Sequence, residues 1–339
     1  MGFAAAEPLD IGRIFQAFTA YQVSGALKGA LELDLFSAIA GGDTTAAALA
    51  RRTGASARGI RMLADFLVTQ AMLHKNGDTY ALSPIAAAFL DRQSPGYVGS
   101  AIQFLASPHL VQAFADVAAA VRRGGTAIRD EGALAPEHPM WVEFARAMAP
   151  IARMAADLVA NLLDATHAPP WKILDVAAGH GLFGIALATA NPRAEVVALD
   201  WENVLAVARE NARAAGVADR FRTIAGSAFA ADYGSGYDLV LLTNFLHHFD
   251  PPTCEVLLRN VHVALKPGGR AVTLEMMPDP NRVTPPEPAA FSLVMLVTTP
   301  GGDAYTFPEL EQMCRNAGFA ASELHDLPPS FQRVVISRK

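Results

Sequence analysis

The chain has 339 residues, 52% of them hydrophobic, which is enough to bury a large core and form two domains. Its formal net charge of −6 argues against nucleic acid as a partner, and its longest apolar stretch, residues 289–297, is too short to cross a bilayer. Residues 1–10 lack the basic start of a signal peptide, so a cytoplasmic protein is expected. Cys254 and Cys314 fall in predicted helices, which favours neither a disulfide framework nor a cysteine metal site.

The first half of the chain, up to about residue 165, carries almost only helical patterns. A long stretch rich in alanine and leucine, residues 14–39, is more apolar than a small helical domain buries alone. Residues 44–54 then predict a short capped helix, residues 56–72 a second helix, and residues 73–83 a hairpin turning at Asn76-Gly77. Two helices followed by a hairpin predict a winged helix.

Winged helices bind DNA in many regulators, usually through a basic and polar second helix. In this chain that helix offers mainly Arg58 and Arg61. The other residues form a broad apolar face better suited to packing on a protein surface: Ile60, Met62, Leu63, Phe66 and Leu67. A DNA-binding regulator is therefore the less favoured alternative.

The second half, beyond the helical stretch of residues 138–164, alternates between strand and helix patterns. The predicted strands are residues 171–177, 194–200, 220–227, 237–244 and 270–277. Such alternation predicts an α/β fold with a doubly wound parallel sheet. Two further strands, residues 321–327 and 331–339, are joined by so short a connection that they must pair antiparallel.

The first strand–helix junction of this half, residues 175–184, carries a ligand-binding pattern. Gly179 and Gly181 stand where the backbone turns tightly into a helix and leaves room for a ligand against bare peptide groups. The G-x-G-x-x-G pattern of dinucleotide-binding folds is incomplete, because Ala177 occupies the first glycine place. Asp200 ends the next strand, where a carboxylate can accept both hydroxyls of a ribose; the alternative for Asp200 is a helix cap.

These features together resemble the class I methyltransferases that use S-adenosylmethionine, specifically the small-molecule O-methyltransferases with an N-terminal winged-helix dimerisation domain. The motifs that carry the resemblance are LDW (199–201), AGSAF (225–229), NFLHHFD (244–250) and LKPGGRAVTLE (265–275). The resemblance implies a Rossmann-like domain whose seven-stranded sheet has an antiparallel last strand. It also implies a homodimer, a dimerisation domain over residues 1–100, a linker and acceptor-pocket region over 101–165, and a methyltransferase domain over 166–339.

S-adenosylmethionine is the cofactor that the resemblance implies. The glycine loop would hold its methionine part, Asp200 its ribose, and Trp201 would flank its adenine. Ser227 stands where the family most often has an aspartate that contacts the adenine amino group, so that contact is expected to differ. The implied cofactor-binding residues are Asp175, Ala177, Gly179, Gly181, Asp200, Trp201, Gly226, Ser227, Ala228, Phe229, Thr243 and Asn244.

The same resemblance places His247 at the general base, because it matches the histidine of the family's L-H-D-W motif. A neutral imidazole suits the removal of a proton from an acceptor hydroxyl. Glu275 matches the glutamate that orients this base, whereas Ala304, beside Asp303, stands where many members have a second acidic residue. The alternative for His247 is a histidine packed in the core.

An apolar pocket for a flat aromatic acceptor, such as a phenol or a polyketide, is expected next to the base. Phe144, Met148, His248, Met295 and Thr299 are its implied lining, although residues of these types at helical spacing are more often plain core. No metal site is predicted. Carbon or nitrogen methylation, or a metal-assisted reaction on the same fold, remain alternatives to O-methylation.

Overall fold

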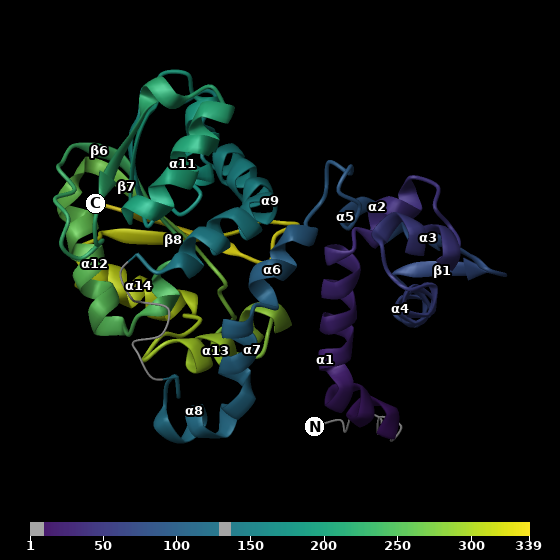
Figure 1. The fold of residues 1–339 in the computed structure, drawn as a ribbon. Coiled ribbons are helices and arrows are strands. Elements are labelled where there is room, and N and C mark those ends of the chain that lie inside the picture. Colours follow the sequence, from purple (N-terminus) through teal and green to yellow (C-terminus); the bar gives the residue numbers. More distant parts are fainter. Residues whose placement is uncertain (1–9, 129–136) are drawn as a thin grey trace, which may run out of the picture. The chain divides into compact units, whose positions relative to one another are not determined.

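The computed structural model describes residues 10–128 and 137–339, so the residues 1–9 considered for a signal peptide lie outside it. The chain forms two compact units, Met1–Ser107 and Pro108–Lys339, which we describe separately (Figure 1). The finer division at residues 100 and 165 stays a prediction.

The N-terminal unit is mainly helical. Its elements are α1 (Ile11–Glu32), α2 (Leu35–Ala40), α3 (Ala46–Thr53), α4 (Ala57–Thr69), β1 (Leu73–Asn76), β2 (Thr79–Leu82), α5 (Pro84–Phe89), η1 (Gly99–Ala101) and α6 (Ile102–Leu105). The long helical stretch predicted over residues 14–39 is two helices, because Asp34 adopts a left-handed φ of 54° between α1 and α2. An α-helix cannot continue through that conformation.

The winged helix is confirmed in the predicted order. Thr45 caps α3 by accepting a hydrogen bond from the N–H of Ala48, and α3 ends at Gly54 with a φ of 70°. Asn76 pairs with Thr79, so the hairpin loop is Gly77-Asp78, one residue later than expected. Large buried side chains hold the unit together: Phe36, Leu49, Ile60 and Leu67.

Asp65 of α4 is the centre of a group of polar contacts that joins the helix to the hairpin. Arg61 of α4 lies 2.9 Å from Asp65, which also accepts hydrogen bonds from Lys75 and Tyr80. This pairing engages Arg61, one of the two arginines that α4 offers, and so reduces the positive charge available for a DNA backbone.

Helix α1 carries an unusual number of exposed apolar side chains. Between 54 and 73% of their surface is exposed in Ile11, Ile14, Phe15, Phe18 and Tyr21. Burying such a stripe against another surface would be favourable by roughly 25 cal/mol per Å² of apolar area.

The C-terminal unit contains one seven-stranded sheet with helices on both faces. Its strands are β3 (Lys172–Val176), β4 (Glu195–Asp200), β5 (Phe221–Ala225), β6 (Tyr237–Thr243), β7 (Leu265–Glu275), β8 (Ala321–Asp326) and β9 (Arg333–Arg338). Its helices are α7 (Pro108–Ala113), η2 (Phe114–Asp116), α8 (Val117–Arg123), α9 (Pro139–Leu162), α10 (Leu182–Ala190), α11 (Glu202–Ala214), η4 (Ala218–Arg220), η5 (Leu246–His248), α12 (Pro251–Ala264), α13 (Pro286–Thr298) and α14 (Phe307–Asn316).

The strand order is β5-β4-β3-β6-β7-β9-β8. The first five strands in this order pair in parallel, and β9 pairs antiparallel with both β7 and β8. The predicted seven-stranded sheet with an antiparallel last strand is confirmed. Cys254 in α12 and Cys314 in α14 are buried and free.

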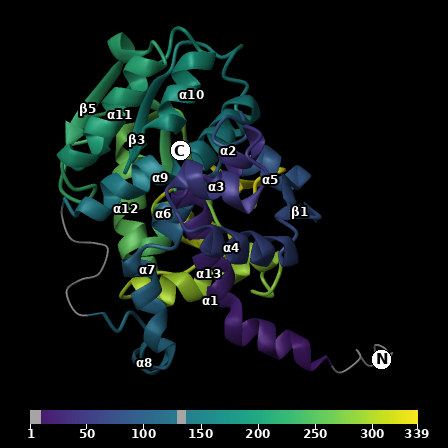
Figure 2. The ribbon, with the colours of Figure 1, turned by 45° about the vertical axis from the view of Figure 1, so that its right-hand side comes forward.

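Alternate residues of the central strands point to opposite faces of the sheet. Ile173 and Leu241 belong to the core that includes α9, α10 and α11, whereas Leu174 and Val240 belong to the core that includes α12 and α14. Figure 1 shows α9 and α11 apart from α12 and α14, and Figure 2 shows α10 and α11 beside β3 and β5. Strands buried on both faces explain the nearly continuous apolar runs in the sequence.

The chain order reverses between β3 and β6, at the centre of the sheet. Ligands of doubly wound sheets bind outside the carboxyl ends of the strands at such a switch point. The loops after β3, β4, β6 and β7 meet there.

Within the described residues, no single helix is both long and apolar enough to cross a membrane. One bent pair, Gly99–Leu105 with Pro108–Arg123, meets the length and composition test when its two parts are taken together.

Candidate active site

The loop between β3 and α10 turns through three left-handed residues. Ala177, Gly179 and Gly181 have φ values of 53°, 57° and 73°. A Cβ at Gly179 would meet only the carbonyl oxygen of Ala177, 4.0 Å away, so this glycine presents open space beside its backbone. A ligand can therefore approach the peptide groups at the start of α10. Ala177 reaches the same conformation at a cost of roughly 1–2 kcal/mol.

Asp200 faces this loop from the end of β4. Its Oδ2 accepts a hydrogen bond of 2.7 Å from the N–H of Gly179, and its Oδ1 accepts one of 2.7 Å from Trp201. Burial raises the pKa of Asp200 to about 6, although the two N–H groups act in the opposite direction. Each carboxylate oxygen keeps a second lone pair, so the group can still accept hydrogen bonds from two ligand hydroxyls.

Asp175 lies beneath the loop near the end of β3 and is fully buried. Its Oδ2 accepts a hydrogen bond of 3.2 Å from Gly184, whereas Oδ1 has no partner among the described residues. Burial raises the pKa of Asp175 to about 8, and the charge of Asp200 adds to this effect. The raised pKa favours the protonated form of Asp175 near neutral pH.

The loop after β5 borders the same edge of the sheet. The N–H of Gly226 donates to the carbonyl of Asp200 at 3.0 Å, and the Ser227 hydroxyl accepts from the N–H of Phe229 at 3.2 Å. Ala228 is buried, and its carbonyl accepts from Tyr233. Ser227 thus stabilises its own turn at the place where the family usually has an aspartate.

Strand β6 ends at two further predicted residues. Thr243 is buried, and Asn244 follows it with a left-handed φ of 56°. The Asn244 N–H donates to the carbonyl of Leu274 at 2.8 Å, and its side-chain oxygen accepts from the amide of Gln332. These contacts fix the chain direction into η5.

His247 and Glu275 form a buried pair, with only 6% and 5% of their side chains exposed. The Nδ1 of His247 lies 2.5 Å from Oε2 of Glu275. Oε1 of Glu275 accepts hydrogen bonds of 3.0 Å and 2.9 Å from the N–H groups of Phe245 and Leu246. Because a carboxylate only accepts, Nδ1 carries the proton, and Nε2 is left with a lone pair in the neutral ring.

Aromatic rings surround this pair. The ring of His247 lies 4.9 Å from Phe291 and 4.3 Å from His248, and Trp141 lies 5.4 Å from His248. Phe144 lies 5.8 Å from Trp141. Trp141 was not singled out from the sequence, although its position one turn before Phe144 on a helix was an available signal.

The half-buried His248 has a lower pKa than an ordinary histidine. Burial lowers its pKa well below the usual range, and the neighbouring His247 lowers it further. Its Nδ1 is buried and has no hydrogen-bond partner within the described part of the chain. His248 is therefore a neutral polar group in an apolar setting.

The other predicted pocket residues differ in their surroundings. Met148 is half-buried on α9, and Met295 is buried on α13. Thr299 is also buried, and its hydroxyl is already engaged by backbone groups of Met295 and Gly302. A pocket of about 530 Å³ lies beside α13, lined by Gly124, Gly125, Leu293, Leu296, Thr299 and Gly302 among others; His247 and Asp200 are not part of it.

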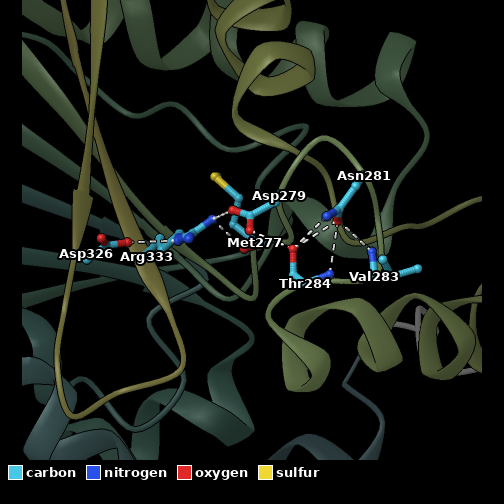
Figure 3. A network of polar contacts seen from close by, with 7 residues as sticks. All are labelled: Met277, Asp279, Asn281, Val283, Thr284, Asp326 and Arg333. Carbon is cyan, nitrogen blue, oxygen red and sulfur yellow. Dashed lines mark hydrogen bonds and ion pairs between the residues drawn. The ribbon is translucent and has the colours of Figure 1, made fainter. Parts of the chain in front are cut away.

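A polar network fixes the segment that leads from β7 to α13. Asp279 accepts hydrogen bonds from Arg333 of β9 at 2.7 Å and from the Thr284 hydroxyl at 2.8 Å, while Asn281 accepts from the N–H of Thr284 at 3.1 Å. Figure 3 shows Asp279 between Arg333 and Thr284. This network holds the start of the helix that presents Phe291 to His247.

No hydrogen bond or ion pair joins Asp303 to His247 in the described part of the chain. Its Oδ2 lies 3.0 Å from Arg282, and its Oδ1 accepts from the N–H of Ala304. Ala304 is fully buried. Among residues 10–128 and 137–339, no group of three or more histidine, cysteine or acidic side chains is placed to hold a metal ion.

Two family models match the chain. An O-methyltransferase domain matches residues 132–320, and an O-methyltransferase dimerisation domain matches residues 15–92. The chain is 31% identical to the tetracenomycin polyketide synthesis 8-O-methyl transferase of Streptomyces glaucescens, over 91% of each protein. It is 29% identical to the 3-hydroxy-5-methyl-1-naphthoate 3-O-methyltransferase of Streptomyces sahachiroi, over 86% of this chain and 84% of that protein.

Solved structures share the fold over the whole chain. A candidate O-methyltransferase of Nostoc punctiforme is 51% identical, with a TM-score of 0.93, over 98% of this chain and 100% of that one. Human N-acetylserotonin methyltransferase in complex with S-adenosylmethionine is 22% identical, with a TM-score of 0.83 over 99% of each chain, which shows a common fold.

The open backbone at Gly179 and the strand-end carboxylate of Asp200 fit a cofactor with a ribose and an amino-acid part, and S-adenosylmethionine is the cofactor of the matched family. The chain belongs to the S-adenosylmethionine-dependent O-methyltransferases.

Proposed function

We propose that this enzyme methylates a hydroxyl group of a small aromatic, polyketide-like acceptor, with His247 as the general base. The observation that carries the proposal is the buried pair of His247 and Glu275 at the carboxyl edge of the sheet, with Nδ1 and Oε2 2.5 Å apart.

His247 would take the proton of the acceptor hydroxyl at Nε2. Glu275 holds Nδ1 protonated, keeps the ring in one orientation, and stabilises the imidazolium that forms when Nε2 takes the proton. Two backbone N–H groups fix the carboxylate in turn. Proton removal would make the acceptor oxygen a better nucleophile, and S-adenosylmethionine, when bound, supplies a methyl group activated by its sulfonium.

For the cofactor, we propose that the Gly179–Gly181 backbone holds the methionine part and Asp200 the ribose hydroxyls. Trp201, with Ala228 and Phe229, would border the adenine. The ring centroids of Phe229 and Phe249 lie 5.0 Å apart in an edge-to-face arrangement. Phe229 is 37% exposed, so part of its ring remains open for contact with a flat ligand.

The aromatic nature of the acceptor is supported by the rings around the base. Phe291, Trp141 and Phe144 offer edges and faces to a flat substrate, with Met148 and Met295 on the same two helices. The names of the two Streptomyces relatives, a tetracenomycin polyketide enzyme and a naphthoate enzyme, point to the same acceptor class.

The central test compares His247→Gln with His248→Gln on a panel of phenols and naphthols with labelled cofactor. We expect His247→Gln to lower kcat by about 10²–10⁴-fold, because general-base catalysis contributes about that much. Cofactor affinity by calorimetry should stay unchanged, and His248→Gln should cost much less. A larger loss in His248→Gln, or transfer to carbon or nitrogen in the product, would contradict the proposal.

We also propose that the enzyme is a homodimer formed through its N-terminal domain. The exposed apolar stripe of α1 supports this, as does the match to a dimerisation domain over residues 15–92. Replacing Phe15 and Phe18 by aspartate should shift the protein to monomers in sedimentation, because two charges would enter the apolar contact. The matched control is the same pair of changes at exposed Val256 and Val263 of α12.

A further inference from the structure

The turn after α13, residues 299–303, lies directly against the backbone of the base. A Cβ added at Gly302 would overlap the carbonyl oxygen of His247 and lie 2.9 Å from the carbonyl carbon of His248. It would also lie 2.7 Å from Oγ1 of Thr299, within the turn itself. A Cβ at neighbouring Gly301 would lie 3.4 Å from Cβ of Asp250, which is ordinary contact. Neither glycine has a positive φ, so the two positions differ in the contacts of the added Cβ with η5 and with Thr299.

The turn is held rigid from within by Thr299. Its Oγ1 accepts a hydrogen bond of 2.9 Å from the N–H of Gly302 and donates one of 2.7 Å to the carbonyl of Met295. Only 1% of Thr299 is exposed. A hydroxyl that is buried and already uses its proton and a lone pair is a structural bridge between α13 and Gly302.

The far side of the turn is also closed by backbone. The N–H of Thr126 donates to the carbonyl of Thr299 at 2.8 Å, and a Cβ at Gly125 would overlap the carbonyl oxygen of Pro300. The turn is thus enclosed between residues 125–126 on one side and His247 on the other. Tightly packed backbone yields little, so a displacement on one side is transmitted to the other.

We infer that this turn positions the catalytic base by direct backbone contact through Gly302, with Thr299 as a positioning residue. Asp303 is turned toward Arg282 and Ala304 has no carboxylate, so the turn supplies a steric stop behind η5 where many family members have a second acidic group. The inference deepens the proposed function and rests on His247 acting as the base.

The first experiment compares Gly302→Ala with Gly301→Ala. The added methyl group at residue 302 should push η5 and displace the His247 ring. Misplacement of a catalytic group by about 1 Å costs roughly 10²-fold, so we expect kcat to fall by about that factor while cofactor affinity by calorimetry is unchanged. Gly301→Ala should keep kcat within about twofold. Equal kcat values for the two variants would overturn the inference.

Thr299→Val and Thr299→Ser provide a milder second test, should Gly302→Ala fold poorly. Valine removes the bridge to Gly302, and we expect kcat to fall about tenfold with the acceptor KM unchanged, since a loosened turn misplaces the base less than an inserted methyl group. Serine keeps the hydroxyl and should restore kcat. A change confined to the acceptor KM would instead make Thr299 an acceptor-binding residue and contradict the positioning role.

A readout without turnover separates this inference from the proposed function. The ¹⁵N signals of the His247 ring, assigned by their loss in His247→Gln, should shift in Gly302→Ala and stay in place in Gly301→Ala. Unchanged signals in both alanine variants would overturn the inference even if His247 is the base. Full activity of His247→Gln would refute the proposed function, whatever the NMR result.

Discussion

The cofactor side and the acceptor side of the site are built in different ways. The cofactor side consists of loops that follow β3, β4 and β5, and its contacts run between Asp200 and backbone N–H groups within a few residues of a strand end. The acceptor side brings together Trp141, His247, Glu275 and Phe291 from four separate elements. One side depends on local backbone geometry and the other on long-range packing.

This difference has a functional consequence. In the proposed site, the backbone cradle would bind the cofactor through peptide groups that substitutions barely alter, so it would tolerate changes in side chains such as Ala177 and Ser227. The proposed acceptor side would use side chains whose positions depend on packing between helices, so substitutions there could change the substrate without disturbing the cofactor loops. Variants on the acceptor side should therefore lower kcat and leave cofactor affinity unchanged. Variants on the cofactor side should lower cofactor affinity and leave kcat nearly unchanged.

The largest expected effect is on the acceptor side, in Glu275→Gln. A glutamine amide can donate to Nδ1 of His247, which would place the ring proton on Nε2 and remove the lone pair that the base needs. We expect kcat to fall by about 10³–10⁴-fold, comparable to the loss when the orienting carboxylate of a catalytic histidine becomes an amide. Cofactor affinity, measured by calorimetry, should stay at the wild-type value.

Glu323→Gln on β8 is the matched control, because that glutamate is exposed and pairs only with surface groups. If Glu275→Gln instead weakened cofactor binding as strongly as turnover, the cofactor side and the acceptor side would be coupled through Glu275. The two sides would then not vary independently.

The second prediction acts on the cofactor side. Asp200→Ala removes up to two charge-assisted hydrogen bonds to the ribose, so we expect cofactor affinity to fall by about 2–4 kcal/mol. Near-normal kcat at saturating cofactor should accompany this loss, because the base is untouched. Asp232→Ala, on the exposed loop after β5, is the control. Calorimetry showing equal affinity for wild type and Asp200→Ala would remove Asp200 from the cofactor site.

The cofactor side was largely predictable from the sequence for the same physical reason. Gly179 and Gly181 were expected to turn the backbone, and both adopt left-handed φ values. Asp200 was expected at a strand end, where it lies. Ala177 shares the left-handed conformation although it is no glycine, which a pattern of residue types does not reveal.

The acceptor side was predictable only where a local motif marked it. His247 comes shortly after β6 and Glu275 is the last residue of β7, and their pairing is expected from the family resemblance. Trp141 was missed because one aromatic residue on an apolar helix looks like core until the tertiary structure brings it to His248. The contact of Gly302 with the base was missed too, since a proline followed by two glycines indicates a turn and not what the turn touches.

The last prediction tests whether the cofactor side contains a buried neutral acid. Asp175 has a usual pKa of 3.8, raised to about 8 in the folded protein by burial. Between these values the folded chain keeps a proton that the unfolded chain has lost, so wild-type stability should fall as pH rises through this window. The fall from this one group is at most about 1.4 kcal/mol per pH unit. Asp175→Asn has no proton to lose and can still accept the hydrogen bond from Gly184.

Urea unfolding of the free protein at pH 5, 7 and 9 would measure this effect. We expect the free energy of unfolding of Asp175→Asn, relative to that of wild type, to increase from pH 5 to pH 7 and to increase further by pH 9. Above pH 9 this difference should change little. The exposed Asp219→Asn should leave the wild-type pH dependence unchanged. Parallel pH curves for wild type and Asp175→Asn would mean that Asp175 is ionised in the folded protein. The cofactor side would then hold a buried negative charge beside Asp200, and backbone geometry alone would not account for its binding properties.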